Sequence, residues 1–251
     1  MYHFFIRPEN VLNDFIVIDG TDVNHIRNVL RMKPGEELLL SDGEGHDYTC
    51  RIDTMLHDEI RCGILSASST GTEPSVKVYL FQGLPKSDKL EHIIQKSVEL
   101  GVHEIIPVQT ARSIVKYAPQ KLGSKQERWQ KISESAAKQS RRGIIPRVMP
   151  VMNFEEALAC AAGLDLVLIP YENYKDIKTT KQILAGIRPG STLGIFVGPE
   201  GGFEQKEVER ACAPKEKHGA DARQISLGAR ILRTETAPLM LLSVILFGLE
   251  E

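Results

Sequence analysis

The sequence lacks several features that would assign it to a well-defined class of protein. It contains no run of eighteen apolar residues, so no membrane-spanning helix is expected. Its first residues, MYHFFIRPEN, show no basic segment followed by a long apolar stretch, which argues against a signal peptide. The four cysteines form no CxxC pair and have no histidine cluster near them, so neither a zinc site nor a disulfide framework is expected. We therefore expect a cytoplasmic protein with reduced thiols, no metal and no membrane partner.

The common phosphate-binding motifs are also missing. Neither GxxxxGK[ST] nor GxGxxG occurs anywhere in the chain. These motifs supply the backbone amides that hold a triphosphate or a dinucleotide pyrophosphate. Their absence disfavours an enzyme that depends on a nucleoside triphosphate or a dinucleotide.

The composition is that of an ordinary globular protein, but its basic residues are clustered. The 251 residues are 42% hydrophobic and 25% charged, which suits one large domain or two smaller ones. The net charge is −2, yet residues 112–147 hold ten basic and two acidic side chains. Clustered Lys and Arg bind polyanions by displacing counterions from phosphates. This segment indicates a nucleic-acid partner, and the alternative interpretation is a solvated helix face. Trp129, in the same segment, is predicted to be a core residue.

The first seventy residues predict a small β-rich module. Short β-branched and aromatic runs indicate strands, and SDGEG at 41–45 indicates a hairpin turn. The apolar spacing of residues 21–31 predicts one helix, with Val23, Ile26, Val29 and Leu30 on a shared face. Residues 66–75, SASSTGTEPS, are small and polar and predict a linker. The strands are predicted at 3–6, 15–18, 37–40, 46–52 and 59–67.

Beyond the linker, predicted strands alternate with predicted helices. This order is typical of a parallel sheet covered by helices on both faces, so we expect an α/β fold. The strands are predicted at 76–84, 103–109, 164–170, 191–198 and 222–228. The helices are predicted at 87–101, 126–140, 176–186, 204–213 and 234–248.

Two glycine-containing turns follow strands in this second part, VGPEGGF at 197–203 and LGARILRTETAPL at 227–239. Ligands of open parallel sheets bind beyond the carboxyl ends of the strands, where both turns are expected. Glycine lets a ligand approach the main chain closely. Because Pro199 offers no amide proton and Glu200 repels anions, a neutral or cationic ligand fits better than a phosphate. The alternative interpretation is that both turns are purely structural and bind no ligand. Thr234, in the second turn, is predicted to cap the last helix.

The same two stretches resemble the signature loops of the RsmE family, 16S ribosomal RNA uridine N3-methyltransferases of the SPOUT superfamily. Further similar segments are NHIRNVLRM at 24–32, DKLEHIIQKSVELGV at 88–102 and ERWQKISESAAKQSRR at 127–142. They occur in the family's order and cover essentially the whole chain. The sequence departs from the expected paired small residues at Ala237–Pro238.

The resemblance implies an N-terminal PUA-like RNA-binding β-barrel followed by a SPOUT-type α/β methyltransferase domain with a C-terminal trefoil knot. The implied boundaries are 1–70 for the barrel, 71–75 for the linker and 76–251 for the methyltransferase domain. A homodimer through the knotted domain is implied, together with S-adenosylmethionine as cofactor. The implied cofactor-binding residues are Leu168, Pro170, Gly198, Pro199, Glu200, Gly201, Gly202, Ser226, Leu227, Gly228, Ile231, Leu232, Thr236 and Ala237.

By the same resemblance, the expected reaction is methylation of N3 of a specific uridine in 16S rRNA of the small ribosomal subunit. Uracil N3 carries a proton that must leave, so a proton acceptor or a cation that stabilises the resulting anion is needed. We expect Arg233 and Glu200 to be the catalytic candidates, a structural Arg233–Glu235 pair being the alternative. The expected RNA-binding residues are Arg7, Arg27, Arg31, Arg112, Arg141 and Arg142. The alternative function is a non-catalytic RNA-binding or ribosome-assembly protein.

Overall fold

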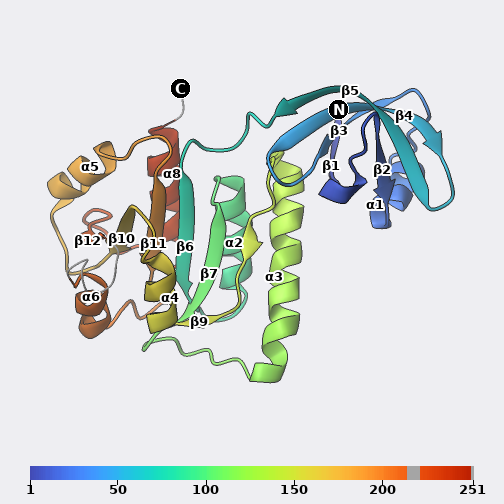
Figure 1. Ribbon diagram of the computed structural model, residues 1–251. Coiled ribbons are helices and arrows are strands. Elements are labelled where there is room, and N and C mark those ends of the chain that lie inside the picture. Colours follow the sequence, from blue (N-terminus) through green and yellow to red (C-terminus); the bar gives the residue numbers. More distant parts are fainter. Residues whose placement is uncertain (214–220, 250–251) are drawn as a thin grey trace. The chain divides into compact units, whose positions relative to one another are not determined.

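The computed structural model describes residues 1–213 and 221–249, and the chain divides into two compact units (Figure 1). The first unit comprises Met1–Glu73 and Ala137–Ile145, and the second comprises Pro74–Ala136 and Pro146–Glu251. The division falls inside helix α3 (Pro119–Ser140). The predicted division into a first domain at 1–70 and a second domain at 76–251 is not tested by these two units and stays a prediction.

The first unit is built on a five-stranded sheet of order β1-β3-β4-β5-β2. β1 runs parallel to β3, and the other neighbouring pairs are antiparallel. β5 continues to Ser69 and pairs with the start of β4, so the first four residues of the predicted linker 66–75 are strand instead. The elements are β1 (Tyr2–Phe5), η1 (Pro8–Asn10), β2 (Phe15–Asp19), α1 (Thr21–Asn24), η2 (His25–Val29), β3 (Glu37–Ser41), β4 (His46–Met55) and β5 (Glu59–Ser69).

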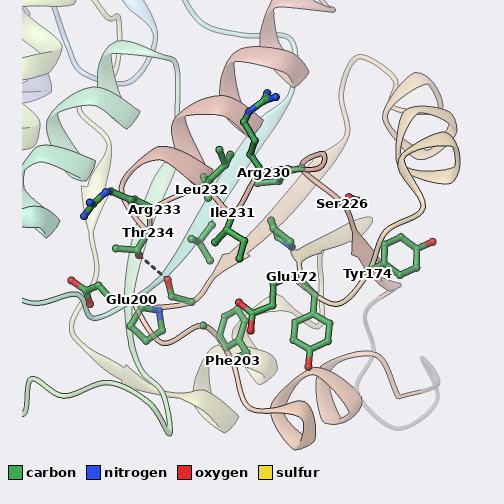
Figure 2. A pocket seen from close by; sticks show the side chains of 18 of the residues that line it. Glu172, Tyr174, Glu200, Phe203, Ser226, Arg230, Ile231, Leu232, Arg233 and Thr234 are labelled. Carbon is green, nitrogen blue, oxygen red and sulfur yellow. Dashed lines mark hydrogen bonds between the residues drawn. The ribbon is translucent and has the colours of Figure 1, made fainter.

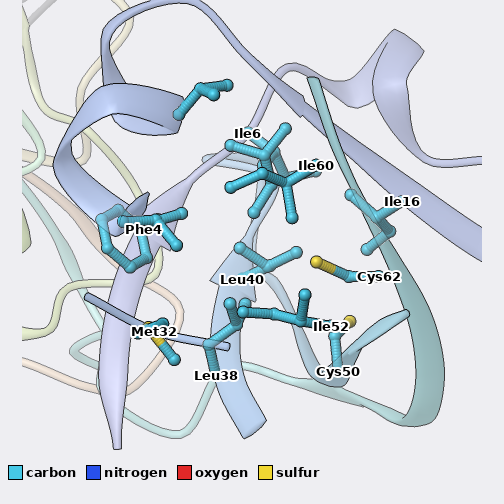
Figure 3. Close-up of a cluster of buried hydrophobic side chains, with 13 residues drawn as sticks. Phe4, Ile6, Ile16, Met32, Leu38, Leu40, Cys50, Ile52, Ile60 and Cys62 are labelled. Carbon is cyan, nitrogen blue, oxygen red and sulfur yellow. The ribbon is translucent and has the colours of Figure 1, made fainter. Parts of the chain in front are cut away.

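Alternate residues of these strands form the core of the first unit, in which Ile16, Leu38 and Leu40 are completely buried (Figure 3). The predicted helix 21–31 is only partly regular. After α1 the chain widens into the π-helical turn η2, in which the Leu30 amide donates to the His25 carbonyl at 2.9 Å. The wider turn rotates the following side chains. Val29 is therefore 64% exposed and does not share the buried face that the spacing predicted.

The second unit contains a sheet of order β12-β10-β11-β6-β7-β8, with β9 also pairing with β7, and all its paired strands are parallel. The predicted parallel α/β fold is thus confirmed. The strands are β6 (Lys77–Gly83), β7 (Glu104–Gln109), β8 (Arg147–Val148), β9 (Met152–Asn153), β10 (Leu166–Pro170), β11 (Thr192–Val197) and β12 (Ala222–Ile225). The helices besides α3 are α2 (Lys89–Glu99), α4 (Phe154–Ala161), α5 (Ile177–Ala185), α6 (Gln205–Ala211) and α8 (Thr236–Phe247).

Helices cover the sheet of the second unit because its strands are apolar on both faces. α4 and α6 bury one face, where the rings of Phe81 and Phe196 stack with centroids 4.2 Å apart. α2 and α8 pack against each other, and Figure 1 shows α4 and α2 on opposite sides of β6 and β7. Trp129 of α3 is buried, which confirms the prediction that it is a core residue.

Two expected absences concern the described ranges, residues 1–213 and 221–249. No helix within them is long and apolar enough to cross a membrane. The same residues contain no group of three or more His, Cys, Asp and Glu side chains that could hold a metal ion.

Candidate functional site

A cavity of about 300 Å³ lies at the carboxyl ends of three adjacent parallel strands, β12, β10 and β11. Its wall is formed by the segments that follow these strands, around residues 170–175, 197–203 and 226–234 (Figure 2). The start of α8 adds Ala237, and the start of α2 adds Lys89. This is the place where open parallel sheets bind their ligands.

The loop after β11 folds so tightly that it requires glycine. A Cβ atom on Gly198 would lie 2.8 Å from the carbonyl carbon of Gly202, closer than real Cβ contacts. Gly202 itself has φ 65°, a left-handed conformation that favours glycine, and its amide donates to the Pro199 carbonyl at 2.9 Å. A Cβ on Gly83 at the end of β6 would lie 2.6 Å from Cδ of Pro199. The loop is therefore packed directly against the sheet and its shape is fixed by the backbone.

Thr234 joins this loop to the start of α8. Its hydroxyl donates to the Gly198 carbonyl at 2.7 Å and accepts a hydrogen bond from Gln82 Nε2 at 3.0 Å. The prediction that Thr234 caps the last helix is wrong, because α8 begins at Thr236 and the cap residue Glu235 makes no side-chain cap bond. The buried Thr234 hydroxyl instead connects β6, the loop after β11 and the segment before α8.

Lys89 carries the positive charge that neutralises two acids at the cavity. Its ammonium lies 2.9 Å from Glu200 and 3.4 Å from Glu235. Burial alone would raise the pKa of Glu200, but the hydrogen bond from Lys89 and the amide of Lys86 outweigh it, and the pKa is lowered. The hydrogen bond to Glu200 in turn raises the pKa of Lys89. Since Glu235 faces Lys89, the structure shows no Arg233–Glu235 pair among the described residues.

Most of the predicted cofactor residues meet at this cavity. Leu168 does not line it, because it lies two residues before the end of β10 with its side chain fully buried in the sheet. Gly201 and Thr236 are also outside the lining. The predicted residues that line it are Pro170, Gly198, Pro199, Glu200, Gly202, Ser226, Leu227, Gly228, Ile231, Leu232, Arg233 and Ala237.

Sequence reasoning missed several residues of the wall, above all Lys89, Glu172 and Arg230. Glu172 comes two residues after β10. The rule that located the glycine turns, polar residues just beyond a parallel strand, could have found it. Lys89 carries no such signal, because it reaches the cavity from the start of α2. Phe203, Tyr171 and Tyr174 add aromatic surface to the wall.

The arginines predicted to bind RNA are found in different settings. Arg142 is buried and forms two hydrogen bonds with the Glu73 carboxylate, at 2.8 and 2.6 Å, so we leave it out of the proposed RNA contacts. Arg112 donates to the Gly201 carbonyl at 2.8 Å and thereby braces the glycine loop. Arg31 and Arg141 are exposed and both have left-handed backbone angles.

Two further arginines of the first unit already have partners. Arg7 pairs with Asp19, and Arg27 donates to the carbonyls of Leu56 and His57. Both guanidinium groups are nevertheless on the exposed surface, where such contacts exchange readily with solvent.

Four of the ten basic side chains in segment 112–147 pair with acids from elsewhere in the chain. A local charge count cannot reveal this, because the partners are distant in sequence. The pairs are Arg128 with Glu91, Lys138 with Asp22, Arg142 with Glu73, and Arg147 with Glu104.

The cavity suits S-adenosylmethionine better than a phosphate compound. Gly198 lines the cavity, and any side chain there would collide with the backbone of Gly202 in the same loop. The Gly202 amide is already bonded within the loop, and Pro199 has none, so two amides of a phosphate cradle are missing. Apolar Phe203, Ile231 and Leu232 complete the wall, as in typical pockets for small organic ligands.

Comparison with known proteins agrees with this fold. Residues 72–246 match the RNA methyltransferase domain family, and residues 18–61 match the RNA methyltransferase PUA domain family. The chain is 41% identical to ribosomal RNA small subunit methyltransferase E of Bacillus subtilis over 236 residues, covering 93% of this chain and 90% of the relative. It is 32% identical to the same enzyme of Mesomycoplasma hyopneumoniae, covering 97% and 98%.

Solved structures extend the likeness to the whole chain. The methyltransferase E of Neisseria gonorrhoeae bound to S-adenosyl methionine superposes with a TM-score of 0.79 at 33% identity, covering 98% of this chain and 96% of that one. A Legionella pneumophila structure with bound cofactor SAM gives 0.78 at 28% identity, covering 98% and 97%. The chain therefore belongs to the ribosomal RNA small subunit methyltransferase E (RsmE) family and is an S-adenosylmethionine-dependent rRNA methyltransferase with a PUA-like first domain.

Proposed function

We propose that this enzyme methylates N3 of one uridine in 16S rRNA of the small ribosomal subunit, with S-adenosylmethionine held in the cavity between the three loops. The observation that supports this most is the closely packed glycine loop, where a Cβ on Gly198 would meet the Gly202 backbone at 2.8 Å. Such a loop offers main chain, not charge, to the adenosyl part of the cofactor. The bound cofactor supplies an electrophilic methyl group on a sulfonium.

The chain's own contribution to the chemistry concerns the uracil proton. Loss of the proton from N3 leaves negative charge on O2 and O4, which a permanently charged, planar guanidinium stabilises well. Arg233 is exposed at the cavity and has no side-chain partner among the described residues, so we assign it this role. Glu200, the other catalytic candidate, has a lowered pKa and faces Lys89, which makes it a weak proton acceptor. We assign Glu200 to holding the loop in place.

RNA contacts are proposed for the first unit. Arg31 and Arg141 are exposed, and their side chains make no hydrogen bond or ion pair with any residue that the structure describes. Arg7 is exposed and Arg27 is partly exposed, and both make contacts that phosphates can replace. Phosphate contacts of this kind position RNA without reading its sequence. The target base itself must be unpaired, because N3 takes part in base pairing.

A homodimer is proposed from the surface of α8. Met240, Val244 and Phe247 follow helical spacing and are 38%, 47% and 80% exposed, although α8 buries its opposite side. Large apolar side chains gathered on one exposed face mark an interaction surface. A second copy of the chain would cover it through a two-fold interface. The trefoil knot in this domain and a cytoplasmic location remain part of the proposal.

Methyl transfer onto ribosomal particles tests the proposed function. Small subunits that lack this modification are incubated with the enzyme and labelled S-adenosylmethionine, and the rRNA nucleosides are identified by mass spectrometry. We expect 3-methyluridine, and an Arg233→Ala variant should lose most of the turnover while it still binds the cofactor. A different methylated nucleoside would contradict the proposed substrate, and no methylation of any rRNA would contradict the proposed reaction.

A further inference from the structure

Two carboxylates at the cavity differ in what they contact. Glu200 lies 2.9 Å from Lys89 and accepts a hydrogen bond from the Lys86 amide at 3.1 Å. Glu172 also lines the cavity, but it forms no hydrogen bond or ion pair with any part of the chain that the structure describes. One acid is therefore neutralised by the protein, while the other is left to interact with a ligand.

The Glu172 carboxylate is held over the glycine loop. A Cβ on Gly202 would lie 3.3 Å from Glu172 Oε2, so the absence of a side chain there lets the carboxylate approach the loop backbone. Figure 2 shows Glu172 between Ile231 and Phe203, within the ring of side chains. Glu200 lies at the left edge of the same view, and its carboxylate points away from Glu172.

The positive side chains near the cavity leave the charge of Glu172 uncompensated. Lys89 is engaged by Glu200, and Figure 2 shows the guanidinium groups of Arg230 and Arg233 directed away from Glu172. Lys175 also belongs to the wall, but it forms no hydrogen bond or ion pair with Glu172. Glu172 is exposed, and a carboxylate without a cationic partner favours a cationic ligand because opposite charges attract.

We propose that Glu172 makes the pocket sensitive to the charge of its ligand, favouring the sulfonium of S-adenosylmethionine over the neutral thioether of S-adenosylhomocysteine. The inference rests on the proposed cofactor pocket. Methyl transfer breaks the sulfur–methyl bond, forms the nitrogen–methyl bond and releases the N3 proton to solvent water, so the sulfur loses its positive charge. The attraction by Glu172 ends at that moment, while the uncharged loop backbone binds both forms alike. Product release is thereby favoured over substrate release.

Calorimetric titration of the full chain with three ligands tests this assignment. The ligands are S-adenosylmethionine, S-adenosylhomocysteine and sinefungin, in which a protonated amine replaces the sulfonium. For Glu172→Gln we expect about a tenfold weaker binding of both cationic ligands, equal to about 1.4 kcal/mol. Binding of the neutral thioether should change less than twofold. Glu172→Asp, which keeps the charge, should retain most of the preference, and Glu209→Gln on the exposed side of α6 should change nothing.

Thermal unfolding of each variant shows whether it is folded. The ratio of the affinity for S-adenosylmethionine to the affinity for S-adenosylhomocysteine is compared only among folded variants. An equal loss for the cationic and neutral ligands, or an unchanged ratio, would overturn the charge-sensing role of Glu172. If the unaltered protein binds none of the three ligands, the cofactor pocket itself is wrong. The two failures are therefore distinguished by the unaltered protein.

Discussion

Replacing Thr234 by valine removes one hydroxyl and keeps the shape of the side chain. That hydroxyl is the donor to the Gly198 carbonyl at 2.7 Å and the acceptor from Gln82 Nε2 at 3.0 Å. Gln82 is completely buried and keeps only its bond to the Gly83 carbonyl, so one of its amide protons loses its partner. A buried group left without a partner costs about 1–3 kcal/mol, and Gly198 itself is only partly buried. We therefore expect about 2 kcal/mol of lost stability, which lowers Tm by roughly 4–8 °C in a protein of this size.

The same substitution should loosen the cofactor site, because Thr234 joins two of its loops. Calorimetry should show about a tenfold weaker affinity of Thr234→Val for S-adenosylmethionine, and Thr234→Ser, which keeps the hydroxyl, should stay within about threefold of the unaltered protein. Gln82→Leu combined with Thr234→Val should cost less than the sum of the two single changes, since both act through one network. Equal affinities for the valine and serine variants would refute this account of the loop.

Three further changes test other parts of the site. Gly198→Ala should abolish measurable cofactor binding, because its Cβ would collide with loop backbone at 2.8 Å, whereas Gly201→Ala meets only a side chain at 3.4 Å and should bind nearly normally; matched calorimetry of the two variants decides this. Lys89→Met removes the partner that holds Glu200 and with it the loop after β11, so the loosened loop should lower S-adenosylmethionine affinity severalfold while Tm changes little, and unchanged affinity would remove Lys89 from the site. Val244→Glu places a charge in the exposed apolar face of α8 and should convert a dimer to a monomer in light scattering; a dimer that persists would place the interface elsewhere.

The parallel sheet was predictable because its strands are short apolar runs that end at glycine or proline. The run that forms β11 ends in the glycine loop, and that which forms β10 ends at Pro170, so local pattern and tertiary position agree. The helix predicted at 21–31 was less predictable. Its apolar spacing fits a regular α-helix, yet a π-helical turn at η2 turns Val29 outward, and no local signal distinguishes the two.

The site was predictable only as far as backbone position determines it. The glycine turns were located because ligands gather where parallel strands end. The partners of individual side chains could not be predicted, because these partners come from segments that are distant in the sequence. Lys89 of α2 pairs with Glu200, and Glu73 pairs with Arg142. The sequence predicted both Glu200 and Arg142 to act on a ligand, but in the folded chain each has a partner within the protein. Thr234 resembles a helix cap until the Gly198 carbonyl, 36 residues away, is placed beside it.

A crystal structure of the protein grown with S-adenosylmethionine tests the central claim most directly. The account predicts electron density for the cofactor in the cavity, with the adenosyl part against the backbone of residues 198–202 and 226–232, and with the sulfonium nearer to Glu172 than to Glu200. Density for the cofactor at another place on the chain would contradict the account.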